Sequence, residues 1–211
     1  MAELVSPGAW ESHIHVFDPN HFETYTPQQT IQRSAGATRC GAWRISIPTT
    51  YSEKLDDLGV RCVRFHWGYG DAEQKSNDVF RDLGAVSDKT ARLGWVVDVF
   101  CPLAVWADMA DNMRNLDPRT RVVAEHFGGA GPGDEEGAEF RTLLQLLREK
   151  RVYFELSAFT RLCHDHPAGL DAMAPLVKAV VEAGPDRVPY GSDWPRIQPG
   201  FPREGRQRSS A

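Results

Sequence analysis

The chain has 211 residues, of which 41% are hydrophobic and 25% are charged, and its formal net charge is -5. This balance is usual for a globular protein of one domain, and the negative charge disfavours general binding to nucleic acid or anionic membranes. We find no run of roughly 18 apolar residues and no basic and apolar leader, so we expect a cytoplasmic protein without a membrane span.

The four cysteines are widely spaced and form no CxxC pair. They are Cys40, Cys62, Cys101 and Cys163. In a cytoplasmic chain, cysteines with this spacing are expected to stay as reduced thiols, so neither a disulfide framework nor a zinc knuckle is indicated.

Short apolar runs alternate with amphipathic stretches along most of the chain. The predicted strands are, in order, 13–17, 42–47, 60–67, 95–100, 121–125, 152–157 and 188–192. The predicted helices are 79–93, 103–116, 139–148 and 170–183. This alternation predicts βαβ units and a parallel sheet, which is an α/β fold.

Two segments do not follow this pattern. Residues 28–41 (QQTIQRSAGATRCG) are polar and too short to supply the helix that a first crossover needs. Residues 196–211 are rich in proline and arginine, so we expect a disordered tail after a single domain at 1–195.

A histidine pair lies in the first predicted strand, ESHIHVFDP. Side chains alternate between the faces of a strand, so His13 and His15 point the same way and can meet at one site. Taken alone, the pair is equally well explained as two polar residues on a half-buried strand.

Further polar residues follow the later strands. The apolar strand in RVVAEHFGG delivers Glu125 and His126 to its carboxyl end, before a glycine-rich loop. VYFELSAFTRL repeats this arrangement with Glu155, Ser157 and Arg161, and Asp193 follows VPYGS. The carboxyl ends of parallel strands meet on one face, where active sites form. Taken singly, the histidine could be a strand cap and the aspartate a turn residue.

Two arginines, Arg61 and Arg64, lie three residues apart in GVRCVRF. That spacing puts them on opposite faces of a strand, so we expect one of them to point inward, while a surface salt bridge remains the alternative for either. A second histidine pair, His164 and His166, falls in a polar stretch before a proline, and we interpret it as a solvated loop.

With these residues in place, the chain resembles the amidohydrolase-related family and, within it, the 2-pyrone-4,6-dicarboxylate lactonase branch. The matching stretches are SHIHVFDP, YTP, LGVRCVRF, LGWVVDV, VVAEHFGG, VYFELSAFTRL and DRVPYGSDWP, in family order across most of residues 11–195. The resemblance implies a TIM (β/α)8 barrel and a hydrolase acting on a small carboxylated cyclic ester.

The resemblance also implies roles for individual residues. Asp193 would activate water as a general base, while His13, His15 and His126 would polarise the carbonyl group. The candidates for binding the carboxylates of the substrate are Arg61, Arg64, Arg161 and Ser157.

The resemblance leaves the cofactor and the activity open. We expect no obligatory metal; the alternative is one Zn²⁺ or other divalent ion held by His13, His15, His126 and Asp193. The alternatives to a lactonase are a metal-dependent decarboxylase and a catalytically inactive truncated member. The expected partner is a small carboxylate, and the oligomeric state is not indicated.

The sequence departs from the family pattern in several places. A TIM barrel typically needs roughly 250 residues, and the region of the second strand and the last helix are missing, so we expect an incomplete barrel. Glu125 stands where aspartate is usual, Glu155 where lysine is frequent, and Arg196 where histidine is expected.

Overall fold

The structure is a computed structural model that describes residues 39–42, 49–57, 60–66 and 76–193. The predicted first strand, with His13 and His15, lies outside the described residues, as does the predicted tail at 196–211.

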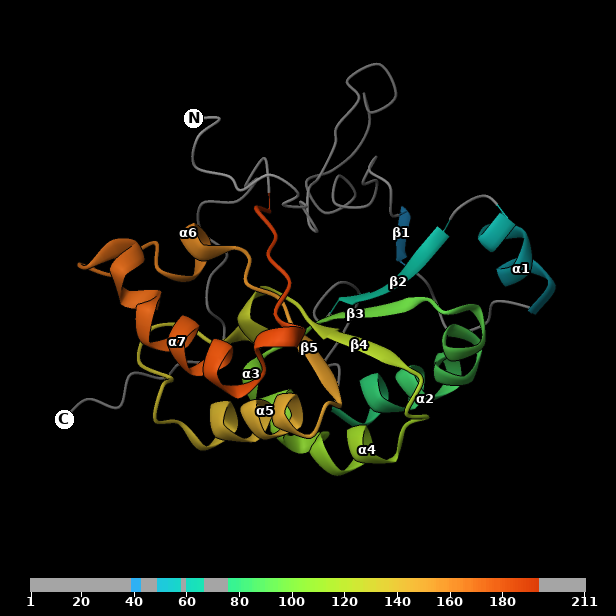
Figure 1. Cartoon of the computed structure of the whole chain (residues 1–211), viewed down its shortest axis with the longest axis horizontal. Helices are drawn as coiled ribbons and strands as arrows, with labels where there is room; N and C mark the ends of the chain where they lie inside the picture. Colours follow the sequence, from blue (N-terminus) through green and yellow to red (C-terminus); the bar gives the residue numbers. More distant parts are fainter. Residues whose placement is uncertain (1–38, 43–48, 58–59, 67–75, 194–211) are drawn as a thin grey trace, which may run out of the picture.

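The described part is built around a parallel β-sheet (Figure 1). Its strands are β1 (Arg39–Ala42), β2 (Val60–His66), β3 (Val96–Phe100), β4 (Arg121–Ala124) and β5 (Val152–Phe154). They are hydrogen-bonded in the order β1-β2-β3-β4-β5, so each strand pairs in parallel with the next one in the chain. This sequential parallel order is the arrangement of strands in a TIM barrel.

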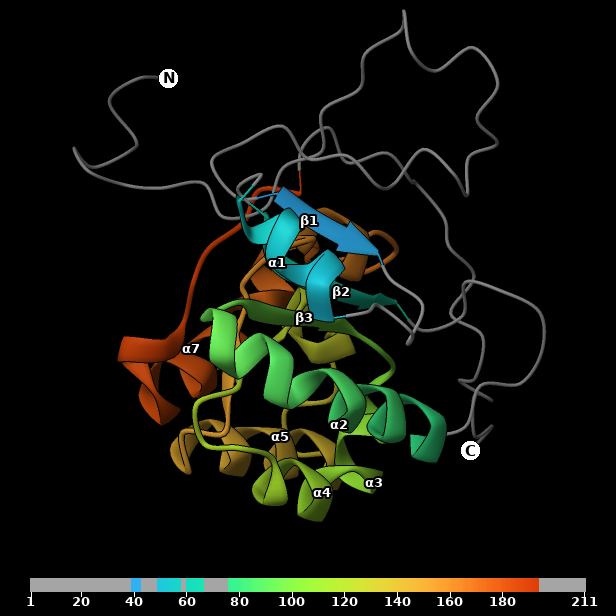
Figure 2. The same ribbon diagram turned by 90° about the vertical axis from the view of Figure 1, so that its right-hand side faces the viewer.

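Helices connect the strands and cover the sheet. They are α1 (Thr49–Asp57), α2 (Ser76–Leu93), α3 (Leu103–Asp108), α4 (Ala110–Asn115), α5 (Ala138–Arg148), α6 (Phe159–Leu162) and α7 (Ala174–Ala183). Three short 3-10 helices, η2 (His126–Gly129), η3 (Gly169–Met173) and η4 (Pro185–Arg187), complete the described elements. Both views place α2, α3, α4 and α5 along the same face of the sheet (Figures 1 and 2).

The alternation of side chains divides the sheet into two unlike faces. Val97 and Val99 of β3 are fully buried in the core, while Asp98 between them is half-buried on the other face. In α5, Phe140, Leu143 and Leu147 recur at helical spacing and are buried in the same core. The charged face of the sheet is therefore the one turned away from these helices.

Most predicted elements are confirmed within a few residues. The predictions at 60–67, 95–100 and 121–125 correspond to β2, β3 and β4, and the helix predicted at 139–148 corresponds to α5. The prediction at 170–183 covers η3 and α7.

Other boundaries were wrong. The strand predicted at 42–47 is β1 at Arg39–Ala42, because pairing with β2 uses the RCGA segment; residues 43–48 lie outside the described part. Residues 103–116 form two helices that meet at Met109, although the backbone N–H of Met109 still donates to Val105 and that of Met113 to Met109. Helix α1 was not predicted.

The last two predicted strands are shorter than expected. β5 ends at Phe154 rather than at Ser157, and residues 188–192 contribute an isolated bridge between Leu156 and Tyr190. Backbone hydrogen bonds from Leu156 to Pro189 and from Gly191 to Leu156 nevertheless keep this segment beside β5. None of the helices in the described ranges is long and apolar enough to cross a membrane.

Candidate functional site

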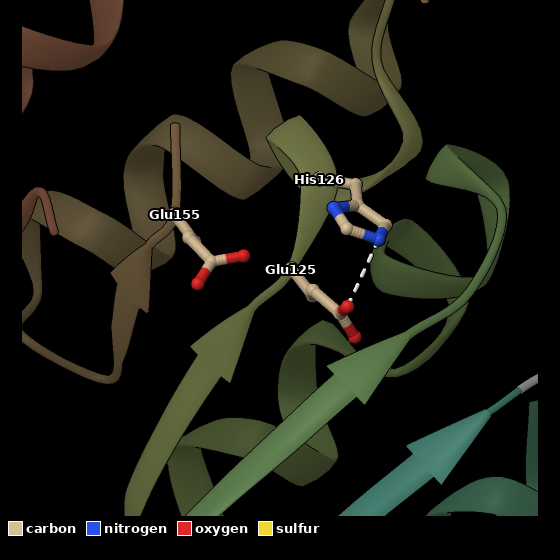
Figure 3. Close-up of side chains that lie close together, drawn as sticks. All are labelled: Glu125, His126 and Glu155. Carbon is tan, nitrogen blue, oxygen red and sulfur yellow. Dashed lines mark ion pairs between the residues drawn. The ribbon is translucent and has the colours of Figure 1, made fainter. Parts of the chain in front are cut away.

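Two glutamates extend the strands at the carboxyl edge of the sheet. The backbone N–H of Glu125 donates to the carbonyl of Val99 at 3.1 Å, and that of Glu155 donates to the carbonyl of Ala124 at 3.0 Å. Each residue thus continues the parallel ladder just beyond β4 or β5. Both side chains are buried, so two carboxyl groups enter the interior on neighbouring strands (Figure 3).

A left-handed turn follows Glu125 and places the imidazole of His126. His126, Phe127, Gly128 and Gly129 have φ angles of 51°, 57°, 59° and 79°. A Cβ atom on Gly129 would lie 2.7 Å from the carbonyl oxygen of Cys101, so only glycine fits there without displacing the backbone. The HFGG sequence therefore provides the two glycines that this turn needs after its strained histidine and phenylalanine.

His126 is bonded through both of its ring nitrogens. Its Nε2 lies 2.9 Å from Oε1 of Glu125, the contact drawn as a dashed line in Figure 3, and its Nδ1 lies 2.7 Å from Oγ of Ser157. The ring also meets Phe100 edge to face, with the ring centroids 5.2 Å apart. These contacts fix the orientation of a side chain that is only 2% exposed.

Ser157 joins His126 to the second glutamate. Its hydroxyl donates to Oε2 of Glu155 at 2.6 Å, while its oxygen is the partner of Nδ1. A hydroxyl has one proton, so if Ser157 donates to Glu155, Nδ1 of His126 must donate to the oxygen of Ser157. In the reverse arrangement, a protonated Glu155 donates to Ser157, and Ser157 donates to Nδ1. Glu155, Ser157 and His126 thus form a continuous hydrogen-bonded chain.

A guanidinium group binds the other end of this chain. Arg64 of β2 donates from Nε to Oε2 of Glu125 at 2.8 Å and from Nη2 to Oε1, a two-point contact with one carboxylate. Its Nε also lies 3.9 Å from Oδ2 of Asp98 on β3. Strands β2, β3, β4 and β5 all contribute to this cluster, which consists of Arg64, Asp98, Glu125, His126, Glu155 and Ser157.

Three members of the cluster have the spacing of metal ligands. One ligand atom from each of Glu125, His126 and Glu155 lies within 4.8 Å of the others. However, Arg64 binds both oxygens of Glu125, and both nitrogens of His126 have partners. The donor set therefore does not fit a metal ion while Arg64 is in place. Asp193 is not part of this group.

Arg161 and Asp193 form a second pair near the cluster. Nη2 of Arg161 lies 4.0 Å from Oδ2 of Asp193, and the guanidinium carbon is 5.5 Å from the centroid of the Phe100 ring. This Nη2 is buried and has no hydrogen-bond partner within the described part of the chain. Asp193 is buried and has a positive φ of 54°.

The structure brings together only some of the predicted site residues. His126, Ser157 and Arg64 lie in one cluster, whereas Arg61 is exposed on the other face of β2 and bonds to Asp56 at 2.8 Å. The expectation that one of the two arginines points inward is therefore confirmed for Arg64. His164 and His166 are exposed, as a solvated loop requires.

Sequence reasoning missed part of the cluster. Glu125 and Glu155 were expected at strand ends and noted as departures from a family pattern, but they were not predicted as site residues. Asp98 and Phe100 were not considered. A lone polar residue in the apolar strand WVVDVF is the one signal that could have indicated Asp98. Cys62, Cys101 and Cys163 are buried and form no disulfide bond within the described part of the chain.

Comparison with solved structures agrees with this architecture. A probable 2-pyrone-4,6-dicarboxylic acid hydrolase from Acinetobacter baumannii, solved with citric acid bound, gives a TM-score of 0.62 at 22% identity and covers 76% of this chain and 59% of its own. An apo structure from Agrobacterium tumefaciens gives 0.59 at 20% identity, covering 75% of this chain and 56% of its own. These likenesses show the fold, which is that of the TIM-barrel amidohydrolases, here in partial form.

Sequence comparison identifies two relatives. A 2-pyrone-4,6-dicarboxylate hydrolase from Comamonas testosteroni is 30% identical over 161 residues, which are 71% of this chain and 50% of that protein. A 4-sulfomuconolactone hydrolase from Hydrogenophaga intermedia is 24% identical over 238 residues, 91% of this chain and 76% of that protein. The chain thus spans half the length of the Comamonas relative.

The sequence model of the Amidohydrolase family matches residues 24–207, which is most of the chain. This match includes every residue of the cluster as well as Arg161 and Asp193. Together with the parallel sheet and the polar residues at its carboxyl edge, it shows that the chain belongs to the amidohydrolase family.

Proposed function

We propose that the protein is a hydrolase that opens a lactone or similar cyclic ester of a small carboxylated substrate. The observation that carries this proposal is the Arg161–Asp193 pair, in which a buried guanidinium nitrogen without a described hydrogen-bond partner lies beside a buried carboxylate. A buried N–H of this kind needs an acceptor, and a substrate carboxylate would supply one. Two relatives named as hydrolases, one of a pyrone dicarboxylate and one of a muconolactone, support the substrate class.

In the proposed reaction, Asp193 accepts a proton from water as the water oxygen attacks the carbonyl carbon. The new carbon–oxygen bond forms, the ring carbon–oxygen bond breaks, and Asp193 returns its proton to the ring oxygen, which becomes a hydroxyl. Arg161 holds a substrate carboxylate, and Phe100 packs against the guanidinium. His13 and His15, outside the described residues, are proposed to polarise the carbonyl.

The part played by His126 follows from its partners. Both ring nitrogens are engaged, by Glu125 and by Ser157, so a bond to the substrate carbonyl would have to replace one of them. We therefore assign His126 to holding the cluster beneath the substrate, with any contact to the carbonyl made by exchange of the Glu125 bond. Arg64 is committed to Glu125, which leaves Arg161 as the proposed carboxylate-binding arginine of the described part.

The test is turnover of 2-pyrone-4,6-dicarboxylate by the purified chain. We expect loss of the ring absorbance together with a product heavier by one water, measured by mass spectrometry. Asp193→Asn should lower kcat by about 10²-fold or more because it removes the base. Asp171→Asn changes an exposed aspartate in η3 and should turn over like the wild type.

Arg161 provides a separate test of substrate binding. Arg161→Met should raise KM more than it lowers kcat, and Arg161→Lys should recover part of the loss. Release of CO2 instead of uptake of water would support the decarboxylase alternative. A cooperatively folded wild-type chain without turnover would contradict the proposal and favour a catalytically inactive member.

A further inference from the structure

Arg64 is a largely buried cation that lies among carboxylates. Its side chain is 11% exposed, that of Glu125 is fully buried, and that of Asp98 is 14% exposed. Two hydrogen bonds join the guanidinium to Glu125, one to each oxygen, and Asp98 lies 3.9 Å away. Arginine is suited to this position because its planar donors match a carboxylate and it keeps its charge when buried.

The cluster needs a positive charge. Glu125 contacts one nitrogen of His126, Glu155 reaches the other through Ser157, and Asp98 lies 3.9 Å from Arg64. Buried carboxylates that lie this close repel each other unless a cation lies between them. In proteins that cation is often a divalent metal ion, and the atoms of Glu125, His126 and Glu155 have a compatible spacing. Here Arg64 already binds both oxygens of Glu125.

We propose that the guanidinium of Arg64 is the resident cation of this cluster and occupies the place that a divalent metal ion would otherwise take. Arg64 is thus a positioning residue, which holds Glu125 and, through it, His126. The chain with Arg64 in place binds no divalent ion at these residues. The proposal concerns the same region as the proposed hydrolysis, but its test measures metal binding, so failure of one is distinguishable from failure of the other.

The test removes the guanidinium of Arg64 and measures whether a metal ion binds in its place. In Arg64→Met, an apolar side chain of similar length frees Glu125 while His126 and Glu155 remain. We expect this variant to bind about one equivalent of Zn²⁺ or Co²⁺, at least about tenfold more tightly than the wild type, since removing a positive charge favours a cation. Calorimetry gives the affinity, and the visible spectrum of Co²⁺ reports its ligands.

Two variants control for charge and for position. Arg64→Lys keeps a cation at the site and should not gain the metal ion. Arg61→Met removes an arginine from the exposed face of the same strand and should bind metal no better than the wild type. A double variant, Arg64→Met with His126→Ala, should lose the gained binding because it removes a ligand.

Several results would overturn the proposal. It fails if Arg64→Met binds metal no more tightly than the wild type, or if Arg61→Met gains binding equally. It also fails if the wild type binds one equivalent of Zn²⁺ that Glu155→Gln removes, because Glu155 is not among the four residues of the alternative metal site. If Arg64→Met is unfolded in the presence of a chelator, the variant is refolded with and without Zn²⁺. Recovery of the folded state only with Zn²⁺ supports the proposal. Failure to recover the folded state with Zn²⁺ contradicts it.

Discussion

At the scale of single residues, the turn after β4 has a strained backbone that is held in place by the packing of its side chains. Each non-glycine residue in the left-handed region costs roughly 1–2 kcal/mol, and His126 and Phe127 are consecutive. The anchor is Phe127, which is fully buried, packs edge to face against Phe159 at 4.9 Å, and donates its backbone N–H to Glu155 at 3.0 Å. The turn persists because core packing and the His126 hydrogen bonds offset its strain.

Alanine substitutions at Gly129 and Gly133 distinguish the cost of backbone strain from the cost of a steric clash. Both have positive φ, but a Cβ on Gly129 would strike the Cys101 carbonyl, whereas one on Gly133 meets nothing within 4 Å. We expect Gly129→Ala to lower the free energy of unfolding by more than about 2 kcal/mol and Gly133→Ala by about 1 kcal/mol. Urea unfolding measures both, and equal losses would contradict the close contact.

Ser157→Ala tests the hydrogen-bonded chain. The change removes the hydroxyl between Nδ1 of His126 and Glu155, leaving two buried polar groups without this partner. We expect a loss of about 1–3 kcal/mol in the free energy of unfolding, against less than about 0.5 kcal/mol for Thr142→Ala on the exposed face of α5. If urea unfolding shows both variants to be equally stable, Ser157 does not link the two residues.

At the scale of elements, an ion pair joins two helices on the outer side of the sheet. Arg114 of α4 donates to Glu149, the residue that follows α5, at 2.7 Å, and Gln145 donates to the same carboxylate at 2.9 Å. The hydrogen bond from Arg114, followed by that from Gln145, lowers the pKa of Glu149 below its usual value. The pair is solvent-accessible, so its contribution to stability is small.

The lowered pKa of Glu149 gives the ion pair a defined pH dependence. A carboxyl group whose pKa is lower in the folded state stabilises the fold above its ordinary pKa, and this contribution is lost as the pH falls through the lowered value. Arg114→Gln should therefore lower the midpoint of thermal unfolding slightly at pH 7, and the difference from the wild type should shrink below pH 4.5. A difference that grows in acid would contradict the pairing.

At the scale of the whole molecule, one layer of helices encloses a core against the parallel sheet. Trp106, Phe140 and Leu143 from the helices meet Val97 and Phe154 from the strands, and all five are buried. Cys101, which follows β3, is 1% exposed in the same core, and burial raises the pKa of its thiol well above the usual value. The thiolate is thus disfavoured as long as the core stays closed.

Labelling of Cys101 reports on this closed core. We expect a thiol reagent to modify Cys101 at the rate at which the protein unfolds, with rapid reaction in denaturant. Peptide mapping by mass spectrometry identifies the modified residue, so the other cysteines do not interfere. Rapid modification in native buffer, without loss of structure, would show that the core around Cys101 opens locally.

The sequence predicted those parts of the fold that depend on local patterns. β3, β4 and α5 were placed correctly because their apolar residues repeat with the period of a strand or a helix. α1 was missed since its TTYSEKLDD sequence is mostly polar, and β1 was placed three residues late because the neighbouring AWRISI run is more strand-like. Pairing with β2 decides the position of β1, and pairing is not local.

The position of the candidate site could be predicted from the sequence, but the contacts between its side chains could not. The rule that parallel strands deliver residues to one edge predicted a site near His126, Ser157 and Arg161, and these residues lie close to that edge. Their roles stay predictions. The bond between Arg64 and Glu125 depends on the register of β2, β3 and β4, which no single stretch specifies. The roles proposed for His13 and His15 stay predictions, because both residues lie outside the described part.

The bond between Arg64 and Glu125 spans 61 residues of chain, and it links two strands that are not neighbours, since β3 lies between them. The cluster therefore exists only when β2, β3 and β4 are all in place. Any partial opening that detaches β2 leaves Glu125 buried without its cation, at a cost of several kcal/mol. The ion pair at the carboxyl edge thus couples the position of β2 to the site. Detachment of β2 and disruption of the site are therefore expected to occur together, as one cooperative event.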